Sequence, residues 1–225
     1  IPLATLAAMA VGTIGGSINA GVALLGRIHP IVVTLGTMTI YRGLLITLTG
    51  GRAIGDLPPQ FVRLFSTSIF GVPLGAVMAI LVAVAMHVFL TWTRSGRHLY
   101  AYGASPTAAK LVGISQRAAW MTAFGVGGLL TGIAGLFELA KIGSMQSTLG
   151  TGYELRAIAA AVIGGTAITG GRGSVFGVVL GALLLSLLYN ALVLWNVSGF
   201  HYQLVVGVLI LVAVLLDLWW RRSEA

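Results

Sequence analysis

The fold class of this chain is decided by residues 69–92, IFGVPLGAVMAILVAVAMHVFLTW. This run holds no acidic residue, no lysine and no arginine, and His87 is its only titratable side chain. A helix that crosses the roughly 30 Å hydrocarbon core of a bilayer needs about 20 consecutive, predominantly apolar residues. The run meets that requirement and predicts a transmembrane helix.

Apolar runs of similar length recur on both sides of this segment, at residues 3–25, 31–49, 119–140, 173–195 and 203–219, with a shorter run at 154–170. Hydrophobic residues make up 57% of the 225 residues. Only 8% are charged, against roughly 25% in soluble proteins, so the charged residues cannot cover a water-exposed body of this size. We predict an all-α integral membrane protein, a single domain over residues 1–225, with about six transmembrane helices of which one is short or broken.

Glycine is unusually frequent, with 32 residues that lie mostly inside the apolar runs. Small residues let the backbones of two membrane helices approach closely. Two series repeat at four-residue spacing and predict packing faces, namely Gly128 with Gly132, and Gly173 with Gly177 and Gly181.

The distribution of basic residues predicts the orientation of the chain. The net charge of +8 does not indicate nucleic-acid binding, because the basic residues form no dense patch with interleaved aromatics. They lie mainly between the spans, and positive loops remain on the cytoplasmic side. If residues 93–118 are cytoplasmic, eight basic residues fall inside and four outside. This orientation requires residues 154–170 to cross the membrane and predicts a cytoplasmic carboxyl terminus.

The sequence offers no catalytic or metal-binding constellation. Cysteine is absent, the four histidines are scattered, and no glycine-rich phosphate loop ending in Gly-Lys-Ser/Thr is present. We predict that the chain is not an enzyme and that it holds no metal ion or nucleotide itself.

Polar residues at membrane depth indicate where function resides, because burying one costs several kcal/mol unless it is paired or lines a wet cavity. Arg42, Asn19 and Asn190 lie well inside apolar runs, and we assign them, with Thr34, to a candidate translocation pathway. The alternative is that each makes an interhelical hydrogen bond or reaches toward the membrane surface. The pathway interpretation requires several of them to converge on one cavity. Since the spans hold almost no carboxylates away from their ends, we expect the driving energy to come from a partner protein.

The longest polar segment, residues 93–118, is the candidate docking site for that partner. Ser105 fits a helix cap with Pro106 at the first helical position, and Gly113 fits the helix end. Between them, Ala108, Ala109, Lys110 and Leu111 form a short helix with a small apolar face. Such a helix suits a groove on another protein, although an ordinary interfacial connector would show the same pattern.

Three stretches give the chain a family resemblance. Residues 96–103 (GRHLYAYG) and 108–114 (AAKLVGI) resemble the cytoplasmic loop of ribose-type ABC importer permeases. Residues 150–160 (GTGYELRAIAA), which run on into VIGGT and GGRG, match the same family, as do VTLGT at 33–37 and YRG at 41–43. These motifs follow the family's order over most of the chain.

The resemblance implies a permease subunit of the bacterial plasma (inner) membrane. It implies a second permease as partner, in a homo- or heterodimer, a cytoplasmic ABC ATPase that binds ATP and Mg²⁺, and a periplasmic or lipid-anchored sugar-binding protein. Carried over, Ala108, Ala109 and Gly113 belong to a coupling helix that meets the ATPase, while Tyr153 and Glu154 lie on the outer side, near the binding-protein dock. Such permeases have further amino-terminal spans, so we expect this chain to be an amino-terminally truncated part of a larger polytopic bundle.

The function implied is import of a monosaccharide or related sugar by alternating access, with ATP hydrolysis in the separate subunit acting through residues 104–115. Permeases for branched-chain amino acids or nucleosides share the architecture and are the main alternative. An ion-coupled carrier or channel without an ATPase is the other class of function.

Overall fold

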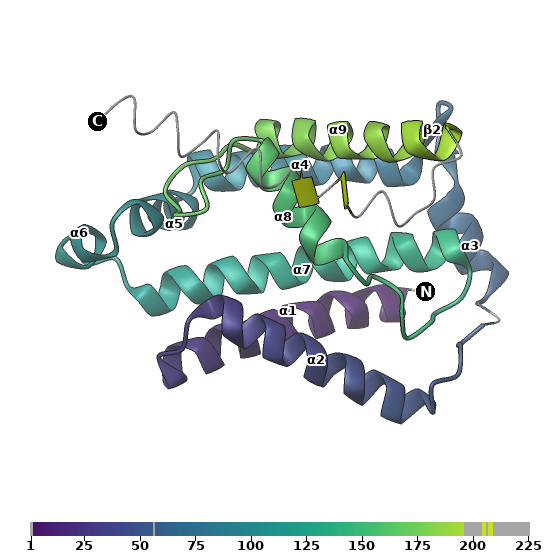
Figure 1. The fold of residues 1–225 in the computed structure, drawn as a ribbon, viewed down its shortest axis with the longest axis horizontal. Helices are drawn as coiled ribbons and strands as arrows, with labels where there is room; N and C mark the ends of the chain where they lie inside the picture. The colour runs from purple at the N-terminus through teal and green to yellow at the C-terminus, as the bar shows by residue number, and fades with distance from the viewer. Residues whose placement is uncertain (1, 56, 196–203, 206, 209–225) are drawn as a thin grey trace. The chain divides into compact units, whose positions relative to one another are not determined.

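The computed structural model describes residues 2–55, 57–195, 204–205 and 207–208. Its named elements, in chain order, are α1 (Pro2–Gly26), α2 (Pro30–Thr49), α3 (Pro59–Ser66), β1 (Ser68–Ile69), β2 (Val72–Pro73), α4 (Leu74–Trp92), α5 (Arg94–Ala104), α6 (Pro106–Leu111), α7 (Gln116–Ile142), α8 (Tyr153–Ile163) and α9 (Val175–Leu194). The protein is predominantly helical over this range and has only one two-stranded hairpin there, which confirms the predicted all-α class (Figure 1).

Five of the described helices, α1, α2, α4, α7 and α9, are long and apolar enough to cross a membrane. They confirm five of the predicted spans, whereas the predicted span 203–219 and the carboxyl-terminal tail lie almost entirely outside the described residues. The segment expected to be short or broken forms only the 11-residue helix α8, which ends at Ile163. At a rise of about 1.5 Å per residue, α8 covers only about half of the hydrocarbon core.

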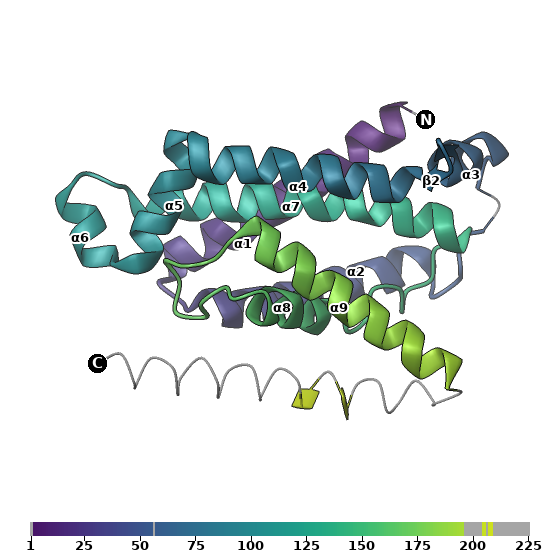
Figure 2. The same ribbon diagram turned by 90° about the horizontal axis from the view of Figure 1, so that it is seen from above.

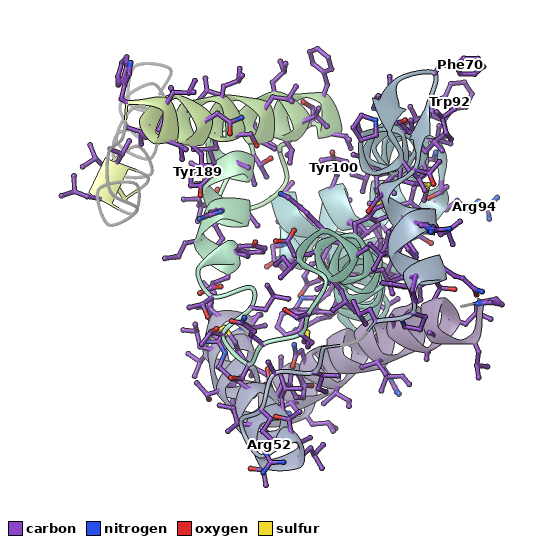
Figure 3. The ribbon with its side chains drawn as sticks, turned by 90° about the vertical axis from the view of Figure 1, so that its right-hand side faces the viewer. Arg52, Phe70, Trp92, Arg94, Tyr100 and Tyr189 are labelled. Carbon is purple, nitrogen blue, oxygen red and sulfur yellow. The ribbon has the colours of Figure 1, made fainter. Side chains whose placement is uncertain are left out.

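The predicted span 69–92 is wrong at its start, because helix α4 begins at Leu74. The preceding residues form a small antiparallel hairpin in which Ser68 pairs with Pro73 and Ile69 with Val72. Its turn residues Phe70 and Gly71 both have positive φ, and Phe70 is fully exposed at the tip (Figure 3). Apolar content alone cannot separate such a hairpin from the helix that follows it.

One compact unit comprises residues 1–81 and 110–149. In it α1 packs along α7, α2 packs against α1, and α3 lies on α7 (Figure 1). The turn between α1 and α2 is short, with Arg27 at a φ of 52° and Pro30 opening α2. Helix α3 carries Phe61, which is buried against Leu136 and Ala140 of α7.

The α1–α7 crossing is a contact between glycines. Gly12 and Gly16 of α1 face Gly128 and Gly132 of α7, and a Cβ added at any of these four would collide with backbone of the other helix. The predicted Gly128–Gly132 series therefore does lie in a helix–helix contact. Its partner on α1 repeats the same four-residue spacing.

The second unit comprises residues 82–109 and 150–225, of which the described part includes α5, α8 and α9. Helices α8 and α9 pack closely (Figure 2), with Gly164 against Gly177 and Ala160 against Gly181. Gly173, expected in the same helical series, lies before the α9 cap residue Ser174 and outside the helix. It faces the Thr166 side chain instead.

Burial follows a membrane pattern, with small residues inside and large apolar side chains outside. Most of the buried hydrophobic residues described are alanines, and no residue of α4 is buried. Large side chains such as Leu81 and Phe176 are more than half exposed. Lipid tails are as apolar as these side chains, so helix contact in a bilayer depends on close packing rather than on hiding leucine from water.

Candidate functional site

Three of the four residues assigned to the pathway line one cavity. Asn19 of α1 and Thr34 and Arg42 of α2 border a cavity of about 320 Å³. Its other lining residues are Thr37, Met38, Tyr41, Leu45, Ser147 and Leu149. Helix α2 supplies most of this wall because Thr34, Thr37, Met38, Tyr41, Arg42 and Leu45 recur at spacings of three and four residues, which places them on one helix face. Asn19, Thr34 and Arg42 thus converge on one cavity, and their role in a pathway stays a prediction.

A second cavity, of about 540 Å³, lies among α1, α2 and α7. It shares Asn19, Thr34 and Tyr41 with the first, so these three side chains form a common wall. Much of the rest of its lining is glycine and small residues of α1 and α7. Both volumes fall within or near the range of ligand pockets, about 300–1,000 Å³.

Asn19 is the most informative residue of this wall. Its Oδ1 atom is buried and has no hydrogen-bond partner among the described residues. An unsatisfied buried acceptor costs about 1–3 kcal/mol, and such groups normally bind water or a ligand. The neighbouring hydroxyl groups are already committed to backbone, since Thr34 Oγ1 donates to Ile31 O at 3.0 Å.

Tyr41 is positioned by helix α1. Its hydroxyl donates to the Gly15 carbonyl oxygen at 3.3 Å, and its ring lies 3.8 Å from where a Cβ on Gly15 would be. Since 3.8 Å is an ordinary van der Waals distance, the hydrogen bond to the backbone, and not the missing side chain of Gly15, positions the Tyr41 ring. In the sequence, Tyr41 stands out only as part of the motif YRG, and nothing in that motif indicates its place in this wall.

The lining combines neutral hydrogen-bonding groups with one charge. Arg42 supplies the guanidinium, and among the described residues that border the two cavities there is no carboxylate and no histidine. Within the described part of the chain, no three His, Asp or Glu side chains gather as metal ligands. This chemistry suits a neutral polyhydroxylated solute and disfavours a cation, which would meet Arg42 without a counter-charge.

Asn190, the fourth pathway residue, belongs to the other compact unit, and its assignment to the pathway stays a prediction. It is exposed on α9, in the other compact unit, and lines neither of the two cavities.

The predicted docking segment has the local structure that its sequence indicates. Ser105 is the only residue between α5 and α6, its Oγ accepts from the Ala108 amide at 3.3 Å, and Pro106 opens α6. Helix α6 ends at Leu111 and is followed by Gly113 at a φ of 82°. Leu111 is 85% exposed while Ala109 is buried. The segment thus presents Ala108, Lys110 and Leu111 outward and keeps Ala109 for its own packing.

Tyr153 and Glu154, the predicted outer dock, form the first turn of α8. Arg156 fixes this turn to α9, because its guanidinium carbon lies 5.3 Å from the Tyr153 ring centre and 5.4 Å from that of Tyr189. Tyr189 projects from α9 on the side of α8 (Figure 3). Such cation–π contacts are worth about 0.5–2 kcal/mol each.

Comparison with known proteins agrees with these features. The chain matches the family described as "Branched-chain amino acid transport system / permease component" over residues 1–215. It belongs to this family of membrane-spanning permeases.

Within the family, the relatives compared are sugar and autoinducer permeases. The chain is 37% identical to the ribose import permease of Escherichia coli K12, over 96% of this chain and 68% of the relative. It is 33% identical to the D-allose transport system permease of the same strain, over 95% and 66%. It is 36% identical to the autoinducer 2 import system permease of Enterobacter sp. 638, over 96% and 63%. The chain thus spans about two thirds of the length of these relatives. No solved structure matches it.

Proposed function

We propose that this chain is the membrane-spanning permease subunit of an ATP-driven importer for a monosaccharide or related sugar, which it translocates by alternating access. The observation that carries the proposal is the cavity bordered by Asn19, Thr34 and Arg42. The relatives named for ribose, D-allose and autoinducer 2 support the same substrate class.

The chemistry of the cavity favours a sugar over a branched-chain amino acid. An amino acid brings a carboxylate that Arg42 would pair with, but also an ammonium group for which the described lining offers no negative charge. A sugar brings hydroxyl groups, which both donate and accept hydrogen bonds and can reach the free Oδ1 of Asn19. An ion-coupled carrier is disfavoured for the same reason, because the described lining offers no carboxylate to hold a proton or sodium ion.

The proposal includes three protein partners. A second permease completes the pathway, an ABC ATPase that holds ATP and Mg²⁺ docks on α6, and a sugar-binding protein delivers substrate on the side of Tyr153 and Glu154. In this arrangement the protein lies in a bacterial plasma membrane with its carboxyl terminus in the cytoplasm. The exposed side chains of α6, Ala108 and Leu111 in particular, support the docking assignment.

The substitution Arg42→Ala tests the pathway. We expect uptake of labelled D-ribose by the assembled, reconstituted transporter to fall about tenfold or more, because the substitution removes a hydrogen bond to a charged group. The complex should remain intact on size-exclusion chromatography. Arg52→Ala is the control, because Arg52 lies beyond the end of α2 and lines neither cavity. Unchanged uptake in Arg42→Ala would make the residue structural.

The substitution Ala108→Glu tests the docking of the ATPase. Ala108 is exposed whereas Ala109 is buried, so a charge at 108 leaves the packing of α6 in place. We expect the variant to lose its ATPase on co-purification. Full retention of the ATPase would contradict the role assigned to α6.

A further inference from the structure

Helix α5 makes an unusually close contact with the turn that joins α8 to α9. A Cβ added to Gly103 would lie 2.6 Å from the Gly171 amide nitrogen, and one added to Gly171 would lie 2.5 Å from Ala104 Cα. The contact is therefore between two backbones and leaves no room for side chains. The Tyr100 hydroxyl extends it by donating to the Gly173 carbonyl oxygen at 2.8 Å (Figure 3).

The α5 side of this contact continues directly into α6. Ser105 alone separates the two helices; its amide donates to Ala101 O at 3.2 Å, and its carbonyl accepts from the Ala109 amide at 2.9 Å. Both helices are thereby hydrogen-bonded to the same connecting residue. A displacement of α6 must be followed by the carboxyl-terminal end of α5.

The turn on the other side is held by its own hydrogen bonds. The Ala167 amide donates to Arg172 O at 3.0 Å, and the Gly170 amide donates to Ala167 O at the same distance. The turn leads into Ser174, whose Oγ caps α9 by accepting from the Gly177 amide at 3.0 Å. Gly177 in turn contacts Gly164 at the end of α8, so the turn and the start of the α8–α9 hairpin form one packed body.

We propose that the contact between α5 and residues 170–173 transmits movement of α6 to the α8–α9 hairpin, with Tyr100 as the positioning residue that keeps the two in register. The inference rests on the proposed function, in which an ATPase displaces α6. It adds a route from that ATPase to the helix pair that carries Tyr153 and Glu154. Neither the sequence motifs nor the relatives' names assign a role to Tyr100 or to this turn.

The experiment uses the assembled transporter with its ATPase and binding protein in liposomes, and measures D-ribose uptake and ATP hydrolysis together. Tyr100→Phe removes the hydrogen bond and keeps the ring. Tyr102→Phe is the matched control, since the Tyr102 hydroxyl makes no hydrogen bond within the described part of the chain. We expect uptake per ATP hydrolysed to fall about two- to tenfold in Tyr100→Phe, the worth of one hydrogen bond, at unchanged assembly and basal hydrolysis. A purely structural role would lower both activities in proportion. An uptake-to-hydrolysis ratio equal to that of Tyr102→Phe would overturn the inference.

Hydrogen–deuterium exchange gives a readout that requires no substrate. Binding of the ATPase is expected to slow amide exchange in residues 164–173 of the unaltered permease, and to do so less in Tyr100→Phe and in Gly103→Ala. If the ATPase binds and exchange in this turn does not change, the transmission route is wrong although the proposed function stands. If no ATPase binds, both are wrong. If the ATPase binds and the turn responds but no D-ribose is taken up, the substrate proposal alone is wrong.

Discussion

The substitution Gly132→Ala should force α1 and α7 to separate locally. The added Cβ would lie 2.5 Å from Ala8 O and 3.1 Å from Met9 Cα, and real Cβ contacts essentially never fall below 3.0 Å. Both of these atoms belong to the backbone of α1, so the two helices must move apart by at least about 0.5 Å at this point. A gap of about 0.5–1 Å forfeits a quarter to a half of the dispersion energy at each affected contact. Overpacking of this kind costs about 1–3 kcal/mol.

Gly135, three residues further along the same helix, provides a control of opposite sign. A Cβ there meets nothing within 4 Å, and alanine is favoured over glycine inside a helix by about 0.5–1 kcal/mol. Gly132→Ala should therefore lower the free energy of unfolding while Gly135→Ala raises it or leaves it unchanged. Thermal unfolding of the purified permease in detergent measures this, with about 2–4 °C in Tm per kcal/mol for a chain of this size. A Tm for Gly132→Ala equal to or above that of Gly135→Ala would refute the close-packed crossing.

Two further predictions concern α3 and α5. Phe61→Ala should destabilise the protein by about 3 kcal/mol, because Phe61 is buried on Leu136 and its ring centre lies 4.8 Å from that of Phe65. Phe70→Ala, at the exposed hairpin tip, should leave the Tm unchanged. Equal effects of the two substitutions on the Tm would contradict the docking of α3. Burial raises the pKa of the Tyr102 phenol above its ordinary value of 10.0. The folded state therefore disfavours the phenolate, and the free energy of unfolding should fall as the pH rises above 10.0 and through the raised pKa. Unfolding curves recorded from about pH 9 to 11 should show this loss in the unaltered protein and a smaller one in Tyr102→Phe; identical curves would show that Tyr102 makes no contribution.

The transmembrane helices were predictable because spanning a bilayer requires a long apolar run, and such runs are visible in any single sequence. The start of α4 was not, because Ile69, Phe70 and Val72 continue the apolar run of the helix, and the hairpin shows itself only in the strand pairing and the positive φ of Phe70 and Gly71. The prediction that Gly173 shares a helix face with Gly177 and Gly181 was wrong for a related reason. Spacing shows which residues would share a helix face, but Ser174 caps the helix and removes Gly173 from it.

The candidate site was predictable only in part. Asn19 and Arg42 are costly at membrane depth, so their presence signals a function, and the structure brings them together with Thr34. Tyr41 gives no such signal, because an aromatic residue in an apolar run is ordinary; its importance depends on Gly15, which lies 26 positions away in sequence. Contacts between distant segments, like that of Tyr100 with Gly173, cannot be read from local pattern at all.

The contact of the proposed transmission route resembles the contacts between the membrane-spanning helices in one respect, because backbone meets backbone in both. Because lipid removes the incentive to bury large apolar side chains, the described crossings of α1 with α7 and of α8 with α9 are made mainly by glycine and alanine. A contact between backbones has no flexible side chains to absorb a displacement, so packed pairs must move together. The contact of α5 with residues 170–173 belongs to this type. A force on α6 is therefore passed on to the α8–α9 hairpin and is not absorbed by side-chain rearrangement. A side chain added at this contact, as in Gly103→Ala, should weaken uptake before it weakens ATP hydrolysis.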